Sequence, residues 1–205
     1  MVKSDMEVEA RMAPEERELF ERYKALIGKP YTPPNEQEAM ENMIIYFWDQ
    51  GREVTKSYIR RWAAVNEDYN ALYFDEEYAK NSRWGGLIAP PLYLISVQDG
   101  LAAPMELYYE IAMPEGMAYN TEKFPNLVSA PQGYTEWEFF EAVRPGDVID
   151  ADHKLSDIYW KAAKPKKGRP FEFTRILFIV AETTYTNQNG ELVARSVSCG
   201  TTLWK

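Results

Sequence analysis

The sequence predicts an α+β fold in which a long antiparallel sheet wraps around one buried helix. Apolar residues recur at helical spacing in the first hundred residues, and they alternate with a period of two from Tyr134 onward. A chain of 205 residues with 45% apolar and 14% aromatic content can fill one large core. We therefore expect a flexible N-terminus over residues 1–13 and a single domain over residues 14–205, with a helical insertion near residues 101–126.

The first half of the chain carries the helix signals. Pro14 and the two glutamates after it begin an amphipathic helix that Gly28 ends, and a proline-rich connector then leads to a short strand over residues 43–48. The other elements expected here are a helix over 57–66, a loop over 68–75, a short acidic helix from Asp75, and a longer, buried helix from Pro91.

The second half has the pattern of an antiparallel meander. Thr135, Trp137 and Phe139 alternate with glutamates, which is typical of a strand with one buried face. The later signals are a Pro-Gly turn at 145–146, a long, bent central strand over 171–186, and an Asn-Gly hairpin at 189–190 that leads into a last strand over 192–204. One edge and one face of such a sheet would stay uncovered, so we expect an oligomer.

Charge and composition argue against several classes of function. Lys and Arg (23) against Asp and Glu (32) give a net charge of −9, so we expect no nucleic-acid partner. No apolar run approaches the roughly 18 residues of a membrane span, and the acidic start lacks the features of a signal peptide, so we expect no membrane partner. The single cysteine, Cys199, fits a reducing compartment, which predicts a cytoplasmic protein. We interpret Cys199 as a buried apolar residue and the single histidine, His153, as a structural one, and we expect no metal site and no cofactor.

Three segments carry a resemblance to a known family. They are IRRWAAVNEDYNALYFDEEYAKNSRWGGLIAPPLYL at 59–94, VRPGDVI at 143–149, and NQNGELVA at 187–194. Together they resemble the MaoC-like hotdog hydratases and dehydratases, and in particular the FAS1-like subgroup, whose N-terminal half carries an I-A-P-P motif. The resemblance covers about residues 28–204 and implies a hotdog fold, in which the sheet wraps around a central helix.

The resemblance also implies a chemistry, which is the reversible addition of water to trans-2-enoyl thioesters. This reaction uses a carboxylate, an imidazole and a backbone donor for the enolate oxygen. In the family motif D-x-N-P-x-H, Asp68 matches the catalytic aspartate and Asn70 the loop-shaping asparagine, but Tyr73 stands where the histidine is expected. Pro91 stands where members have a glycine whose N–H helps to form the oxyanion hole, and proline has no N–H.

These two departures predict a supporting subunit of an enoyl-CoA hydratase, inactive alone. Its partner would be a second hotdog chain with an intact D-x-N-P-x-H motif. One alternative is a homodimeric hydratase or thioesterase with an altered mechanism that uses Asp68 and Tyr73. Another is a non-enzymatic protein that binds acyl-CoA.

The expected ligand is an acyl-CoA thioester, as substrate. We assign Trp84, Gly85, Gly86 and Pro91 to its binding region. The one concentrated basic patch is either a solvated hairpin tip or a site for the phosphates of coenzyme A, and it consists of Lys164, Lys166, Lys167 and Arg169. The Met-rich and aromatic segment within 101–126 is either a flap over the core, a subunit contact, or a lid over a bulky acyl group, branched or polycyclic.

Overall fold

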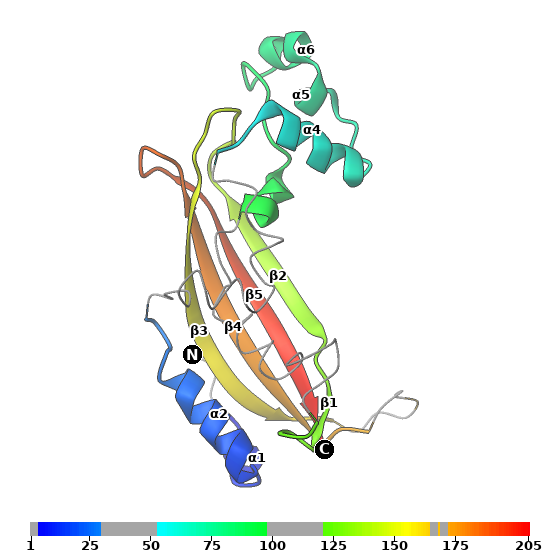
Figure 1. The fold of residues 1–205 in the computed structure, drawn as a ribbon, viewed down its shortest axis with the longest axis vertical. Helices are drawn as coiled ribbons and strands as arrows, with labels where there is room; N and C mark the ends of the chain where they lie inside the picture. The colour runs from blue at the N-terminus through cyan, green and yellow to red at the C-terminus, as the bar shows by residue number, and fades with distance from the viewer. Residues whose placement is uncertain (1–3, 30–52, 98–120, 165–167, 169–171) are drawn as a thin grey trace.

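The computed structural model describes residues 4–29, 53–97, 121–164, 168 and 172–205 (Figure 1). The helical elements are α1 (Met6–Glu9), α2 (Pro14–Lys24), α4 (Lys56–Val65), α5 (Ala71–Phe74), α6 (Glu76–Asn81) and the 3₁₀ helix η2 (Pro91–Val97). The strands are β1 (Leu127–Ser129), β2 (Gln132–Phe139), β3 (Asp150–Ala162), β4 (Arg175–Thr186) and β5 (Leu192–Trp204).

The strands form one antiparallel sheet in the order β1-β5-β4-β3, and β2 also pairs with β5. The predicted α+β class and the long central strand are therefore confirmed, although β4 begins at Arg175 rather than at residue 171. The predicted hairpin joins β4 to β5. Its turn is held by the side chain of Asn187, whose Oδ1 accepts the N–H groups of Asn189 and Glu191 at 3.0 and 3.1 Å. Gly190 takes the left-handed φ of 75° that this turn needs.

One face of β4 is buried along its whole length. In β4 the odd-numbered residues, among them Leu177, Ile179 and Tyr185, are almost fully buried, whereas Ile176 and Phe178 on the other face are half-exposed. The alternation follows from the period of two in a strand. We call the buried side the inner face.

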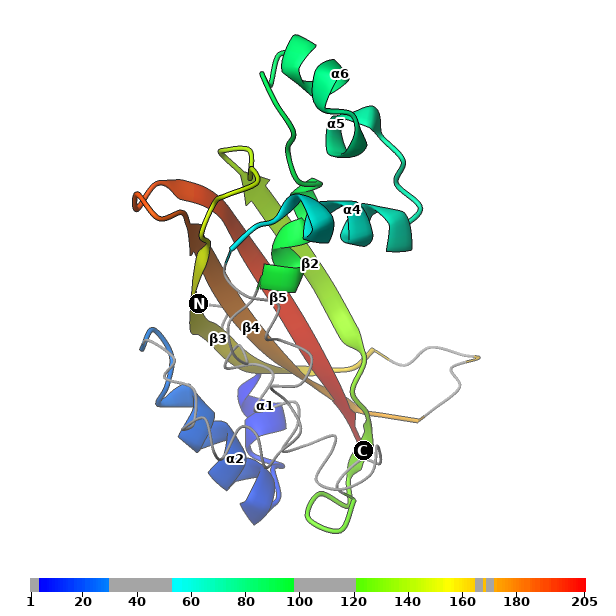
Figure 2. The same ribbon diagram turned by 45° about the horizontal axis from the view of Figure 1, so that its top comes forward.

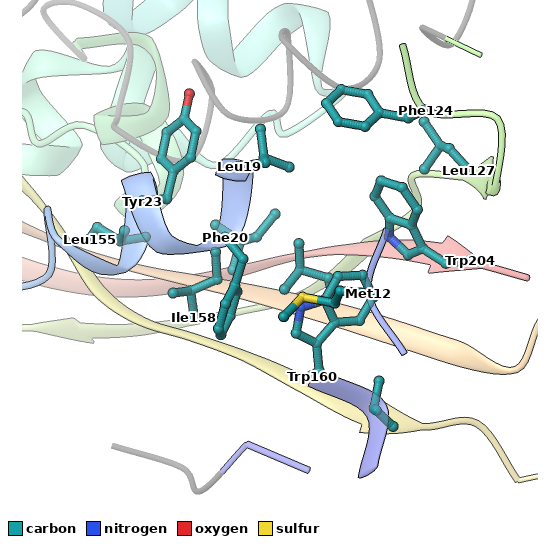
Figure 3. Close-up of a cluster of buried hydrophobic side chains, with 13 residues drawn as sticks. Met12, Leu19, Phe20, Tyr23, Phe124, Leu127, Leu155, Ile158, Trp160 and Trp204 are labelled. Carbon is teal, nitrogen blue, oxygen red and sulfur yellow. The ribbon is translucent and has the colours of Figure 1, made fainter. Parts of the chain in front are cut away.

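The lower part of the inner face packs against α1 and α2 (Figures 1 and 3). Phe20 of α2 lies near Trp160 of β3, with ring centroids 6.5 Å apart, and Trp160 lies edge-on to Trp204 of β5 at 5.5 Å. We expected residues 1–13 to be flexible, but the described part of this segment forms α1 and places Val8 and Met12 in the core. A helix of four residues is too short to show a helical period, so this packing could not be predicted from the sequence.

A buried ion pair joins α2 to the start of β4. The guanidinium of Arg175 donates to both carboxylate oxygens of Glu16, at 2.7 and 3.2 Å, and Asn126 Nδ2 donates to Glu16 Oε1 at 3.1 Å. Arg175 Nε also donates to the carbonyl of Lys205, the last residue of the chain, at 2.9 Å. Both charged side chains are almost completely shielded from solvent. The pair therefore ties an N-terminal helix to the sheet and to the C-terminus.

The upper part of the inner face belongs to a second apolar cluster, built from α4, α5, η2 and the upper ends of the strands. The predicted helix over 57–66 is confirmed as α4, and the acidic helix from Asp75 as α6, with Asp75 as its N-cap. The loop expected over 68–75 was wrong in part, since it contains α5. Asn70 makes this short helix possible by accepting the N–H of Leu72 at 3.1 Å.

The helix predicted from Pro91 begins there, but its described part is the 3₁₀ helix η2 rather than an α-helix. Its first turn has the three-residue spacing of that helix type, because Tyr93 N–H donates to the carbonyl of Pro90 at 2.9 Å. The continuation of this helix, the strand predicted over 43–48 and most of the insertion near 101–126 lie outside the described residues. Of that insertion, Phe124 is described, and it is buried in the lower core.

Glu16→Ala should lower the free energy of unfolding by about 3–5 kcal/mol, because the variant leaves the Arg175 guanidinium buried without its anion. Urea unfolding followed by tryptophan fluorescence measures this change. Glu18→Ala, on the exposed side of the same helix, is the matched control and should change stability by less than about 0.5 kcal/mol. Equal losses in the two variants would contradict the anchoring role of the pair.

The same pair predicts sensitivity to acid. Burial alone would raise the pKa of Glu16, but the hydrogen bonds from Arg175 and Asn126 and the charge of Arg175 outweigh it, so the pKa lies below its ordinary value. A carboxyl with a lower pKa in the folded state stabilises the fold fully above its unfolded-state pKa, and this contribution disappears as the pH falls through the folded-state pKa. Below about pH 4.5 the wild type should therefore lose stability more steeply than Glu16→Gln in urea unfolding at stepped pH.

Candidate functional site

The segment that carries Asp68, Asn70 and Tyr73 is a tight turn followed by α5, at the upper end of the sheet (Figures 1 and 2). The turn after α4 places Glu67 at a positive φ of 55°, and Asp68 N–H donates to the carbonyl of Ala63 at 2.9 Å. Asp68 Oδ1 accepts the N–H of Asn70 at 3.3 Å. Asp68 thus has the local, backbone-satisfying role that such residues often have, and its side chain remains half-exposed.

Tyr73 lies inside the upper cluster and is only 7% exposed. Burial, and after it the negative charge of Asp68, raises the pKa of the Tyr73 phenol. The structure therefore brings Asp68 and Tyr73 into electrostatic contact. A phenol in this setting stays protonated at neutral pH, so it can donate a hydrogen bond but cannot act as the base.

The surroundings of Tyr73 are apolar and aromatic. Tyr93 of η2 belongs to the same cluster, and burial, followed by the neighbouring Tyr58, raises the pKa of Tyr93 to about 12. Neither Tyr58 nor Tyr93 was predicted as a site residue from the sequence. This end of the sheet therefore offers neutral phenols and apolar side chains, with Asp68 at its margin.

The segment from Trp84 to Pro91 is held by the loop at residues 143–149. Arg144 Nη2 donates to the carbonyl of Trp84 at 2.8 Å, and Ala89 N–H donates to the carbonyl of Val143 at 2.8 Å. Gly85 has a left-handed φ of 68°, which suits glycine. Two of the segments that carried the resemblance are thus neighbours in space. Arg144 was not predicted as a site residue from the sequence, although its place directly before the Pro-Gly turn was a signal for it.

Pro91 stands at the exposed beginning of η2, where its ring nitrogen carries no hydrogen. The neighbouring N–H of Ala89 is already bonded to Val143. The backbone donor that the resemblance placed at residue 91 is therefore missing from this chain.

Lys164, the described member of the basic patch, is far from Asp68 within the chain. Lys164 is exposed just after β3, at the lower end of the sheet, whereas α5 lies beyond the upper end (Figures 1 and 2). A strand of 13 residues such as β3 spans roughly 40 Å, so Lys164 and the Asp68 segment do not form one site in a single chain. Lys166, Lys167 and Arg169 lie outside the described residues.

His153 and Cys199 have the structural roles that the sequence predicted. His153 of β3 and Thr183 of β4 are paired across the two strands, between the two apolar clusters. Their Nδ1 and Oγ1 atoms are 2.9 Å apart, and both side chains are buried. Cys199 is fully buried, and burial raises the pKa of its thiol, which makes it a poor nucleophile. In the described part of the chain no group of three or more metal-ligating side chains comes together. Over the same residues, no helix has the length and apolar character needed to cross a membrane.

The fold and the arrangement of these segments define a hotdog protein of the hydratase and dehydratase kind. The chain belongs to the family described as "FAS1-like, dehydratase domain region", whose model matches residues 47–196. The description of the family as a dehydratase region supports a hydro-lyase kind of reaction. The predicted family is therefore confirmed.

A curated relative is the "probable enoyl-CoA hydratase alpha subunit" of Thermomonospora curvata, 31% identical over 143 residues. The match covers 66% of this chain and 40% of that protein, so this chain spans less than half the length of the relative. Among solved structures, the ChsH1–ChsH2 complex from Mycobacterium tuberculosis aligns with a TM-score of 0.59 at 16% identity, over 92% of this chain and 95% of that chain. A "MaoC-like dehydratase" aligns with a TM-score of 0.51 at 16% identity, over 89% of this chain and 43% of that chain. At these identities the two likenesses concern the fold alone.

Asp68→Asn should lower the pKa of Tyr73, because it removes the negative charge and leaves the burial. Alkaline titration by ultraviolet absorbance, with Tyr73→Phe subtracted, isolates this phenol. Because the pKa of Tyr73 is raised in the folded state, the folded protein keeps the phenol proton to a higher pH than the unfolded chain does. The free energy of unfolding should therefore fall as the pH rises above about 10. Glu77→Gln on α6 removes an exposed charge and is the control. An unchanged titration in Asp68→Asn would show that the two groups do not interact.

Proposed function

We propose that this chain is the supporting hotdog subunit of a MaoC-type enoyl-CoA hydratase, or 3-hydroxyacyl thioester dehydratase. A second hotdog chain with an intact D-x-N-P-x-H motif would supply the base. The observation that carries this proposal is the buried, protonated Tyr73 at the position of the catalytic imidazole.

Two losses act on different parts of the reaction. A positioned acid or base contributes about 10²–10⁴ to the rate, and a phenol with a raised pKa cannot replace it. One oxyanion donor contributes about 10²–10³, and Pro91 has no N–H to give. With both removed, the residues of this chain can position a substrate but cannot take and return its proton by the family's mechanism.

The remaining features suit a supporting role. The apolar cluster around Tyr73 and Tyr93 would offer apolar side chains to an acyl chain beside a neutral hydrogen-bond donor. The proposed reaction is acid–base chemistry, which needs neither a metal nor a redox cofactor. The name of the Thermomonospora curvata relative, an alpha subunit, and the two-protein composition of the ChsH1–ChsH2 complex support a heteromeric assembly.

A second candidate function is an enzyme with an altered mechanism. It is favoured by the pairing of a half-exposed carboxylate, Asp68, with the neutral phenol of Tyr73. Asp68 could then accept the proton of water while Tyr73 donates to the substrate. This mechanism would operate in the isolated chain, which separates it from the first proposal.

The purified chain should hydrate enoyl-CoA substrates only at trace rates. In the complex with the partner that co-purifies with the tagged chain, Asp68→Ala should reduce kcat by less than about tenfold, whereas alanine at the aspartate or histidine of the partner's motif should reduce it by about 10²–10⁴. Loss of enoyl absorbance measures the rate. Tyr73→His should not activate the isolated chain, because Pro91 still lacks the backbone donor.

Tyr73→Phe is the control for packing, since it keeps the ring and removes only the hydroxyl. The proposal would be overturned by an isolated chain that turns over at ordinary enzyme rates and loses this activity in Asp68→Ala. Tight acyl-CoA binding without turnover in any complex would instead indicate a binding protein.

A further inference from the structure

A row of polar side chains crosses the inner face of the sheet between the two apolar clusters. His153 of β3 is paired in register with Thr183 of β4, and Thr183 is paired with Ser196 of β5. All three side chains are buried, and on β4 the row is flanked by the buried side chains of Ala181 and Tyr185. The inner face of a sheet is normally apolar, because a buried polar group without a partner costs free energy. We call these three residues the polar row.

The inner face is uncovered beside the polar row, over β5 and β2. Ser198 of β5 is half-exposed, and a Cβ placed on Gly200 would meet no atom of the described residues within 4 Å. Thr135 of β2, which is paired with Ser198, is exposed on the same face. Ala181, the partner of Ser198 on β4, is only 1% exposed. The uncovered stretch therefore begins at β5, and Ser196, which shares a face with Ser198 and Gly200, borders it.

The hydroxyl groups at this border can form further hydrogen bonds. His153 Nδ1 and Thr183 Oγ1 are 2.9 Å apart, so the imidazole fixes the position of the Thr183 hydroxyl. In the described part of the chain, Ser196 Oγ and Ser198 Oγ have no hydrogen-bond partner. A serine or threonine hydroxyl can donate one hydrogen bond and accept two. The polar row can therefore bind one more polar atom at the edge of the uncovered stretch.

The charges near the polar row are on the other face of the sheet. Lys154 and Glu182, which follow His153 and precede Thr183 along β3 and β4, point to the outer face, and so does Arg195 beside Ser196. A carboxylate or phosphate at the polar row would therefore be buried without a lysine or arginine to pair with, which is costly. A neutral hydroxyl or carbonyl oxygen would not carry this cost.

We propose that the polar row is a specificity site for an apolar acyl group that carries a neutral oxygen function, a hydroxyl or a ketone, away from the thioester. Ser196 and Thr183 bind this oxygen, and His153 is a positioning residue that acts through Thr183. The inference rests on the proposed function for the identity of the ligand. Thr183 is two residues from Tyr185, which belongs to the same cluster as Tyr73, so the row lies about 7 Å along the strand from that cluster.

A series of thioesters tests the proposal directly. It consists of trans-2-dodecenoyl-CoA and of analogues in which one hydroxyl is moved along the distal half of the chain. Their Kd values are measured by isothermal titration calorimetry with the purified chain and with its complex with the co-purified partner. At one position the hydroxylated analogue should bind at least about fivefold more tightly than the plain thioester, as one added hydrogen bond in a prepared site allows.

The variants then assign this preference to the polar row. Ser196→Ala and Thr183→Val should each reduce the ratio of the two Kd values to about one and change the Kd of the plain thioester by less than about twofold. Thr184→Val makes the same change on the half-exposed outer face of β4, so it is the matched control and should keep the ratio. If Thr183→Val unfolds the chain, as circular dichroism would show, Ser196→Ala decides the test, because the Ser196 hydroxyl bonds to no described group.

The proposal is overturned if no hydroxylated analogue binds better than the plain thioester. It is equally overturned if the variants weaken both ligands in the same proportion, as residues that only support the fold would do. Tighter binding of an analogue with a terminal carboxylate than of every hydroxylated one would overturn the neutral class of ligand. The ratio of two affinities needs no turnover, so an inactive complex would contradict the proposed function alone, and a lost preference for oxygen would contradict this inference alone.

Discussion

The inner face of the sheet must be covered over the whole length of β4, which for 12 residues is about 40 Å. No single short helix can do this, and the chain divides the task between two apolar clusters. The helices α1 and α2 cover the lower end, and α4, α5 and η2 contribute to the cluster at the upper end. Tyr73 of the candidate site belongs to the upper cluster. Its burial, and with it the raised pKa of its phenol, is therefore a consequence of covering the inner face of the sheet.

The lower cluster needs a device that fixes where the N-terminal helix sits, because apolar contacts alone are not directional. The pair between Glu16 and Arg175 supplies this direction, since each carboxylate oxygen has its own donor and Arg175 is further held by Lys205. The desolvation of two charges costs much of what their attraction returns. The pair therefore contributes mainly to specificity, because it favours one position of α2 on the sheet over other positions.

The long strands could be predicted from the sequence because one-sided burial imposes a period of two on the apolar residues. The hairpin could be predicted because its Asn-Gly pair places a glycine where the turn requires a positive φ, at Gly190. The hydrogen-bond partners of Glu16 and Trp84 could not be predicted from the sequence. They lie 159 and 60 positions away, in Arg175 and Arg144, and only tertiary structure brings them together. At the site, the resemblance identified Asp68, Asn70 and Tyr73, whereas the burial of Tyr73 required the structure, because the four residues of α5 are too few to show a helical period.

The position of Lys164 follows from the direction of β3. Lys164 comes just after the lower end of β3, whereas Asp68 comes just before α5, which lies beyond the upper end of the sheet (Figures 1 and 2), so the two residues cannot share a thioester site within one chain. A partner subunit could complete such a site only if its intact motif came to lie beside the lower end of this sheet. Within the proposed assembly, a chain that has lost its own base could still hold the coenzyme A phosphates of the substrate on which its partner acts.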